Sequence, residues 1–224
     1  MFTRLQITAA LAVATAAWGL ALWLQGTPLS WEHLAPFTTV VGVLVVVALL
    51  MEHVFWRLRI FQGWLFDHPD LRGTWKVTIQ SEWINPGTGE KVPPITAYAG
   101  IVQTLSKLQI QLMTPESESC LLAHAIEPTP CGNRFSVSVV YANTPGVELR
   151  GVRSERHVGA ATISTHGAKY KPESMTAEYW TDRRTVGRMT FEGRVPTVYS
   201  RYEDAQRNLA NAARAGKSSR RVDE

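Results

Sequence analysis

The chain has 224 residues and a formal net charge of +4, and its charged side chains are distributed unevenly. Five of them lie in the first 66 residues, whereas the other 158 residues hold 20 of the 23 basic and 17 of the 19 acidic side chains. This division argues against a wholly soluble globule and against a disordered chain, and an excess of three positive charges is too small to indicate binding to duplex nucleic acid.

Two stretches without Asp, Glu, Lys or Arg, residues 7–24 and 34–51, dominate the N-terminal part. As a helix each would be about 27 Å long, which approaches the ~30 Å hydrocarbon thickness of a bilayer. Gly26 and Pro28 lie between them and indicate a turn. We therefore expect a two-helix transmembrane hairpin in residues 1–66, with spans at about 5–24 and 35–55.

The charges that flank this hairpin predict its orientation. Arg4 precedes the first span, Arg57 and Arg59 follow the second, and the connecting loop has no Lys or Arg, so both ends are expected in the cytoplasm. A cleaved signal peptide is the alternative for the first stretch, but a second apolar stretch follows it directly. Small residues in the first stretch would allow helices to self-associate, although Ala is also simply a good helix former.

After the linker 67–70 the hydrophobic period changes from helical to two, beginning with Leu71, Gly73, Trp75, Val77 and Ile79 on one face of a strand. Further strands, separated by residues that favour turns, are expected at about 95–105, 107–114, 119–126, 133–143, 157–165, 174–182 and 186–195. Eight short strands predict a closed antiparallel barrel or a sandwich, and we favour the barrel because closure leaves no exposed edge. The fold class is therefore a membrane-anchored all-β protein whose barrel domain covers residues 67–200.

The rest of the chain gives weaker signals. Residues 201–224 form a polar tail in which 203–215 can make a short helix, and the end from Gly216 is expected to be disordered. Cys120 and Cys131 have no further ligand at zinc spacing, so we interpret them as small apolar residues.

Alternation along the strands brings polar groups onto the faces that carry the apolar residues. Seven such groups are expected to converge in one region of the interior: Gln103, Tyr141, Asn143, His157, Tyr179, Thr181 and Arg183. They would suit a flat, anionic ligand, because Tyr rings stack on bases, Arg binds phosphate, and amide or hydroxyl groups read base edges. The alternative is a filled core, with Arg183 and Arg184 in a solvated turn.

Motifs of nucleotide hydrolysis, of serine nucleophiles and of zinc proteases are missing from the sequence. His124, His157 and His166 lack the close spacing of metal ligands. We therefore expect no catalytic residue, no metal site and no cofactor.

Four segments follow the two apolar stretches in a characteristic order: Asp70-Leu-Arg-Gly-Thr-Trp75, Tyr141-Ala-Asn-Thr144, His157-Val-Gly159 and Tyr179-Trp-Thr-Asp-Arg-Arg-Thr-Val-Gly187. In this order the chain resembles the two-transmembrane, β-strand-rich effectors of bacterial anti-phage signalling, which belong to the cyclic-oligonucleotide-based defence systems (CBASS). The resemblance covers nearly the whole chain except the tail.

This resemblance implies a cytoplasmic eight-stranded barrel that binds a cyclic dinucleotide made by a partner nucleotidyltransferase of the CD-NTase type. It also implies that binding promotes oligomerisation through the membrane helices and disrupts the bacterial inner membrane, so that the infected cell dies (abortive infection). The expected partners are the cyclic dinucleotide, the lipid bilayer and further copies of the chain, and not a DNA or RNA polymer. Limited to the matching segments plus Gln103, the candidate ligand-binding residues are Gln103, Tyr141, Asn143, Thr144, His157, Tyr179, Thr181 and Arg183.

Two other interpretations remain open. A membrane-tethered carrier or sensor of a lipid or other apolar ligand would have an apolar cavity, with Arg183 and His157 outside it. A structural scaffold would have a filled barrel and no ligand.

Overall fold

The computed structural model describes residues 12, 14–16, 18–20, 22–24, 26, 31–85, 87–150 and 155–220, without the side chains of 31–40 and 215–220. The chain divides into two compact units. The first comprises Met1–Phe61 and Thr104–Ser106, and the second comprises Gln62–Gln103 and Lys107–Glu224.

Helix α2 (Trp31–His53) is the main element of the first unit, and the short 3-10 helices η1 (Phe55–Arg57) and η2 (Arg59–Phe61) follow it. Most of its side chains from Val41 onward are exposed although they are apolar, among them Val43, Leu44, Val46 and Leu49. Of the first expected span, 5–24, the described positions are helical and the others lie outside the described residues. Within the described part of the chain, no helix is both long and apolar enough to cross a membrane.

The end of α2 is hydrogen-bonded to the segment Thr104–Ser106, which belongs to the same unit. The Glu52 carboxylate accepts hydrogen bonds from the Thr104 hydroxyl at 2.5 Å, from the Ser106 amide at 3.2 Å and from the Ser106 hydroxyl. The Glu52 carbonyl oxygen accepts a further bond from the Leu105 amide at 3.0 Å. One acidic residue therefore fixes three consecutive residues to the helix.

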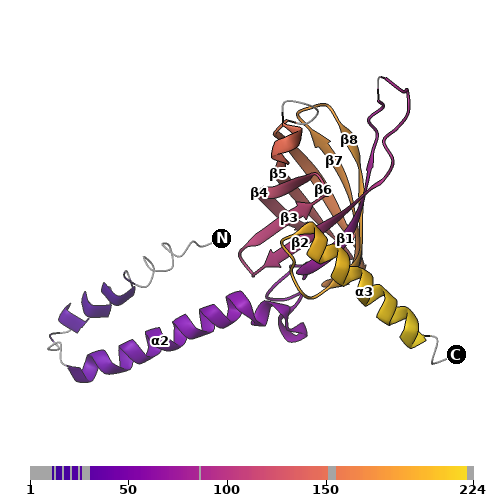
Figure 1. Cartoon of the computed structure of the whole chain (residues 1–224). Helices are drawn as coiled ribbons and strands as arrows, with labels where there is room; N and C mark the ends of the chain where they lie inside the picture. The colour runs from indigo at the N-terminus through magenta and orange to yellow at the C-terminus, as the bar shows by residue number, and fades with distance from the viewer. Residues whose placement is uncertain are drawn as a thin grey trace. The chain divides into compact units, whose positions relative to one another are not determined.

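The second unit contains a closed barrel of eight antiparallel strands in sequence order (Figure 1). Every strand pairs with the next one along the chain, and β8 pairs with β1, so the sheet closes. The strands are β1 (Gly73–Ser81), β2 (Ile95–Gln103), β3 (Leu108–Met113), β4 (Ser117–Pro128), β5 (Phe135–Pro145), β6 (His157–Ala168), β7 (Lys171–Thr181) and β8 (Val186–Val195). The prediction of an eight-stranded barrel is confirmed, and each expected strand overlaps an observed one.

The two ends of the barrel differ in what they carry. We call the end where β1 begins at Gly73 and β8 ends at Val195 the base, and the end where β1 stops at Ser81 and β8 begins at Val186 the rim. Because the strands alternate in direction, odd-numbered strands finish at the rim and even-numbered strands finish at the base.

Apolar side chains fill the barrel between these ends. The strand faces predicted to point inward are buried, and their members include Trp75, Val77, Ala99, Ile101, Val137, Val139, Ala161, Ile163, Met175, Ala177, Met189 and Phe191. Cys120 and Cys131 are not part of this core, because Cys120 alternates with the inward Ser119 and Cys131 lies in the β4–β5 turn. Both cysteines are exposed, so interpreting them as small apolar residues was wrong.

Helix α3 (Tyr202–Arg220) covers part of the outer wall of the barrel. Ala205 and Leu209 are buried against Tyr98 of β2 and Met113 of β3. The helix is longer than the short one expected in the tail and includes residues 216–220, while 221–224 lie outside the described residues.

Candidate ligand-binding site

Five of the candidate residues gather at the rim because of strand direction and side-chain alternation. β5 and β7 end there and bring Tyr141, Asn143, Tyr179 and Thr181, and β6 begins there with His157. The β5 and β6 residues lie in one register, since Asn143 is paired with His157 and Tyr141 with Gly159. Arg183 follows in the exposed β7–β8 turn at the same end.

Each rim tyrosine packs across a glycine of the next strand. Tyr141 is paired with Gly159, and a Cβ atom at Gly159 would lie 2.4 Å from the Tyr141 hydroxyl oxygen. Tyr179 is paired with Gly187, where a Cβ atom would lie 2.7 Å from the Tyr179 ring and hydroxyl. Only glycine leaves room for the rings to lie along the wall, so these Tyr–Gly pairs fix two aromatic groups at the rim. Both glycines belong to the segments that carry the resemblance, but their role depends on the cross-strand register and is not visible in the sequence.

The Tyr141 hydroxyl stays protonated in the folded protein. Burial, assisted by the nearby Tyr179 and by the charge of Asp182, raises the pKa of Tyr141 to about 12. At neutral pH this phenol is therefore a neutral group that can donate a hydrogen bond to an acceptor on a ligand.

Asn143 is buried at the rim and oriented by two serines of β4. Its amide nitrogen donates to the Ser119 hydroxyl at 2.8 Å and to the Ser117 hydroxyl at 3.1 Å. Ser119 is directly opposite Asn143 in the sheet. These serines were not among the predicted site residues, because identifying them requires the β4–β5 register.

The β7–β8 turn closes the rim beside Tyr179. The Thr181 amide donates to the Thr185 carbonyl at 3.0 Å, and the two threonine hydroxyls are 2.6 Å apart. Asp182 ties the turn to β6, because its carboxylate accepts a bond from the Val158 amide at 3.1 Å and its own amide donates to the Val158 carbonyl at 3.0 Å.

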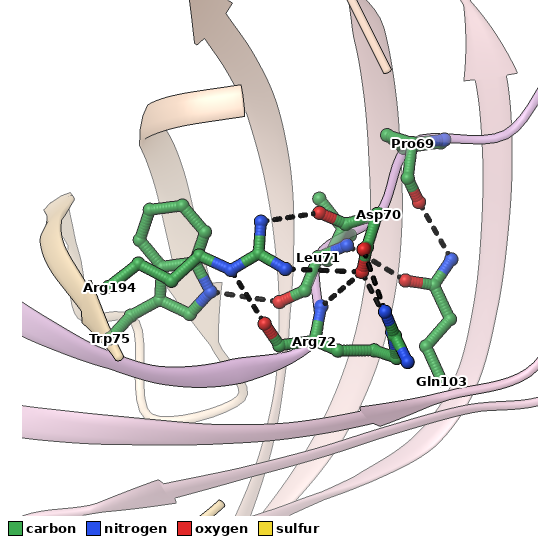
Figure 2. Close-up of polar contacts among 7 residues, drawn as sticks. All are labelled: Pro69, Asp70, Leu71, Arg72, Trp75, Gln103 and Arg194. Carbon is green, nitrogen blue, oxygen red and sulfur yellow. Dashed lines mark hydrogen bonds and ion pairs between the residues drawn. The ribbon is translucent and has the colours of Figure 1, made fainter. Parts of the chain in front are cut away.

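Gln103 does not join these residues, so the expectation that it converges with them was wrong. β2 runs from the rim to the base, and Gln103 therefore lies at the base. Its amide nitrogen donates to the Pro69 carbonyl and its amide oxygen accepts from the Leu71 amide, both at 2.9 Å (Figure 2). Gln103 is 6% exposed, and its two hydrogen bonds hold the linker residues against the barrel.

An arginine completes the network at the base. Arg194 donates to the carbonyl oxygens of Arg72 at 2.7 Å and of Asp70 at 2.9 Å, and its guanidinium lies 5.5 Å from the Trp75 ring centroid (Figure 2). Its third bond, at 3.1 Å, goes to the Asp70 carboxylate. Gly73 allows the end of β8 to pack closely against the start of β1. It has a φ of +115°, and a Cβ atom there would lie 2.2 Å from the Val195 carbonyl oxygen. Leu71, Gly73 and Trp75 of the segment Asp70-Leu-Arg-Gly-Thr-Trp75 thus all take part in closing the base.

Thr144 also lies apart from the rim residues that face inward. It alternates with the inward Asn143 and is paired with the exposed Glu118, so it faces the outer wall. The expectation for this residue came from the matching segment, and the alternation contradicts a position among the inward groups.

A small, mostly apolar cavity lies in the barrel interior. Its volume is about 40 Å³, and its lining includes Ala99, Leu112, Leu121, Ile163 and Phe191, with Tyr141 and Ser119 as polar members. Pockets for small molecules commonly have roughly 300–1,000 Å³, so this cavity is too small for a dinucleotide. Apart from Gln103, the polar groups described above are thus confined to the rim end of the interior, where Tyr141 and Ser119 reach the cavity, and the core between the two ends is apolar.

In a comparison with known protein families, residues 66–193 match the model described as Cap15, cyclic dinucleotide receptor domain. This match covers more than half of the chain and ends within β8. A comparison with curated proteins gave no match. The barrel and the family match together show that the chain belongs to the CBASS effector family that carries the Cap15 cyclic dinucleotide receptor domain.

Proposed function

We propose that the chain binds a cyclic dinucleotide at the barrel rim, with the bases stacked on Tyr141 and Tyr179. Tyrosine rings provide flat faces for any base, and both rings are fixed by their packing against glycines. Asn143, Thr181 and His157 supply hydrogen-bonding groups at the same end, and Arg183 supplies a positive charge.

The observation that carries this proposal is the position of the polar groups above a filled core. The family match supports a cyclic dinucleotide as the ligand. The interior cavity of about 40 Å³ is too small for two nucleotides, which supports the rim as the place of binding. The ligand would then rest on the barrel end instead of inside it.

Calorimetric titration tests this proposal. The full-length chain in detergent is titrated with cyclic di-GMP, cyclic di-AMP, cyclic GMP–AMP and cyclic di-UMP, and we expect at least one to bind in the micromolar range or tighter. Tyr179→Ala should weaken that binding by about 1–3 kcal/mol, the usual contribution of one base stacked on an aromatic ring.

Trp180→Ala provides the matched control, because Trp180 neighbours Tyr179 but is 50% exposed on the outer wall. This control should bind like the wild type. Equal affinity of the Tyr179→Ala variant, with an unchanged thermal transition, would remove Tyr179 from the site.

The apolar lining of the cavity favours a second candidate, a receptor for a lipid or other apolar ligand. His157 and Arg183 are absent from the lining, as this alternative requires. The small volume opposes it, because an acyl chain needs far more space than one methyl group or water. If a fatty acid binds and none of the four nucleotides does, the second candidate replaces the first.

We further propose that residues 1–66 anchor the receptor in the bacterial inner membrane, with the N-terminus and the barrel in the cytoplasm. Two observations support a lipid environment for these residues: the stretches 7–24 and 34–51 carry no charge, and the apolar side chains of α2 are exposed. A partner nucleotidyltransferase would supply the ligand, and binding would promote oligomerisation through the helices and disrupt the membrane.

A further inference from the structure

The β7–β8 turn contains an unusual backbone conformation at Arg184. Its φ is +59°, and every other described residue with a φ in this left-handed region is a glycine. A side chain is disfavoured in this conformation because its Cβ atom crowds the neighbouring carbonyl oxygen.

The hydrogen bonds of the turn impose this conformation. The Arg184 amide donates to the Thr181 carbonyl at 3.0 Å, and the Thr181 amide donates to the Thr185 carbonyl at 3.0 Å. This pattern is typical of a three-residue hairpin loop, in which a type I turn is followed by a left-handed residue that is usually glycine. An arginine at this position therefore lowers stability relative to glycine.

The Arg184 side chain is exposed. Within the part of the chain that the structure describes, it forms no hydrogen bond or ion pair that could offset this loss. The acidic residue of the same turn, Asp182, uses its carboxylate on the Val158 amide instead. The turn therefore presents the Arg184 guanidinium at the rim without an ion-pair partner among the described residues.

This charge lies at the same end as inward groups that include an amide, a hydroxyl and a protonated phenol. Asn143 and Thr181 have neutral side chains, and burial raises the pKa of Tyr141 to about 12, whereas a cyclic dinucleotide carries two phosphodiester charges. A guanidinium can donate two parallel hydrogen bonds to the two free oxygens of a phosphodiester.

We propose that Arg184 is a phosphate-binding residue of the receptor and that the turn keeps an arginine there at a cost in folding stability. This inference rests on the proposed function, because it assigns one more ligand contact to the same rim. It makes Arg184 a contributor to affinity beside Arg183, which occupies an ordinary turn position.

The substitution Arg184→Gly separates the two halves of the proposal. Without ligand, the thermal midpoint should rise by roughly 2–4 °C, because the strain is relieved. The dissociation constant for the tightest-binding cyclic dinucleotide of the panel should increase by roughly tenfold to a hundredfold, because a charged hydrogen bond is lost.

Two further variants complete the test. Arg184→Asn also tolerates the left-handed conformation and lacks the charge, so it should lose affinity like Arg184→Gly. Arg188→Ala removes a positive charge from the outer wall, where Arg188 is paired with Glu178, and its affinity should equal that of the wild type.

The outcomes distinguish this inference from the function on which it rests. A stabilised Arg184→Gly variant with wild-type affinity would refute the phosphate contact and leave the receptor function intact. An unchanged or lower midpoint would refute the stability cost. A wild-type chain that binds none of the four nucleotides would refute the proposed function itself.

Discussion

At the scale of single residues, Asp70 shows how the base holds a charged group. Burial alone would raise its pKa, but the hydrogen bond from Arg72 and the charges of Arg72 and Arg194 outweigh burial and lower the pKa of Asp70 below its ordinary value. The folded state therefore binds this proton less readily than the unfolded chain does, and the carboxylate stabilises the fold above the ordinary Asp pKa of about 3.9.

The pH dependence of stability should show this contribution. As pH falls below about 4 and through the lowered pKa of Asp70, the wild type should lose free energy of unfolding. Asp70→Asn should be less stable than the wild type at pH 7, and the difference should shrink toward pH 2–3. Urea unfolding at several pH values measures both quantities, with the exposed Glu127→Gln as control. A difference independent of pH would contradict the argument.

At the scale of elements, α3 acts as a cover for the outer wall of β2 and β3. Leu209 is 6% exposed and packs in the cluster with Tyr98 and Met113. Leu209→Ala should lower the free energy of unfolding by about 2–4 kcal/mol, because it removes buried methyl groups and leaves a gap. Urea unfolding measures this loss, and the exposed Asn211→Ala on the same helix should change stability little. Equal stability of both variants would show that the helix is only loosely attached.

The strands could be predicted from the sequence because a period of two with turn residues between the runs is a local signal. The cover provided by α3 could not, since it depends on Tyr98 and Met113, which lie on faces that alternation assigns to solvent. Gln103 was misplaced for a different reason. Its residue type suited the site, but in an up-and-down barrel the end of an even-numbered strand lies opposite the end of β5, and topology alone was enough to exclude it.

At the scale of the whole molecule, the proposed function requires the receptor to respond to ligand as an assembly. A ligand shifts an equilibrium only by its difference in affinity for two states, and copies held in one bilayer gain strong avidity from weak pairwise contacts. We expect the full-length chain in dye-filled vesicles to cause leakage only after a binding cyclic dinucleotide is added, with a rate that rises more steeply than linearly with protein density.

Tyr179→Ala serves as the vesicle control, since it should insert equally well and fail to release dye at the same ligand concentration. Leakage without ligand, or saturated binding without leakage, would contradict the coupling between the rim and the membrane. The sequence indicated the type of site at this scale, because it contains the tyrosines and polar groups of the rim. It did not show that the core beneath them is filled, since side-chain packing across eight strands is a property of the folded barrel.

The start of β1 and the end of β8 are held together at the base by the hydrogen bonds of Gln103 and Arg194 and by the close approach of Val195 to Gly73. The segments that join β1 to β2, β3 to β4, β5 to β6 and β7 to β8 connect strands at the rim and contribute to none of these base contacts. Natural drift in those four connections can therefore change length and chemistry without weakening closure. Such a scaffold lends itself to evolutionary retuning, and exchanging one connection between relatives offers a route to receptors with altered messenger preference.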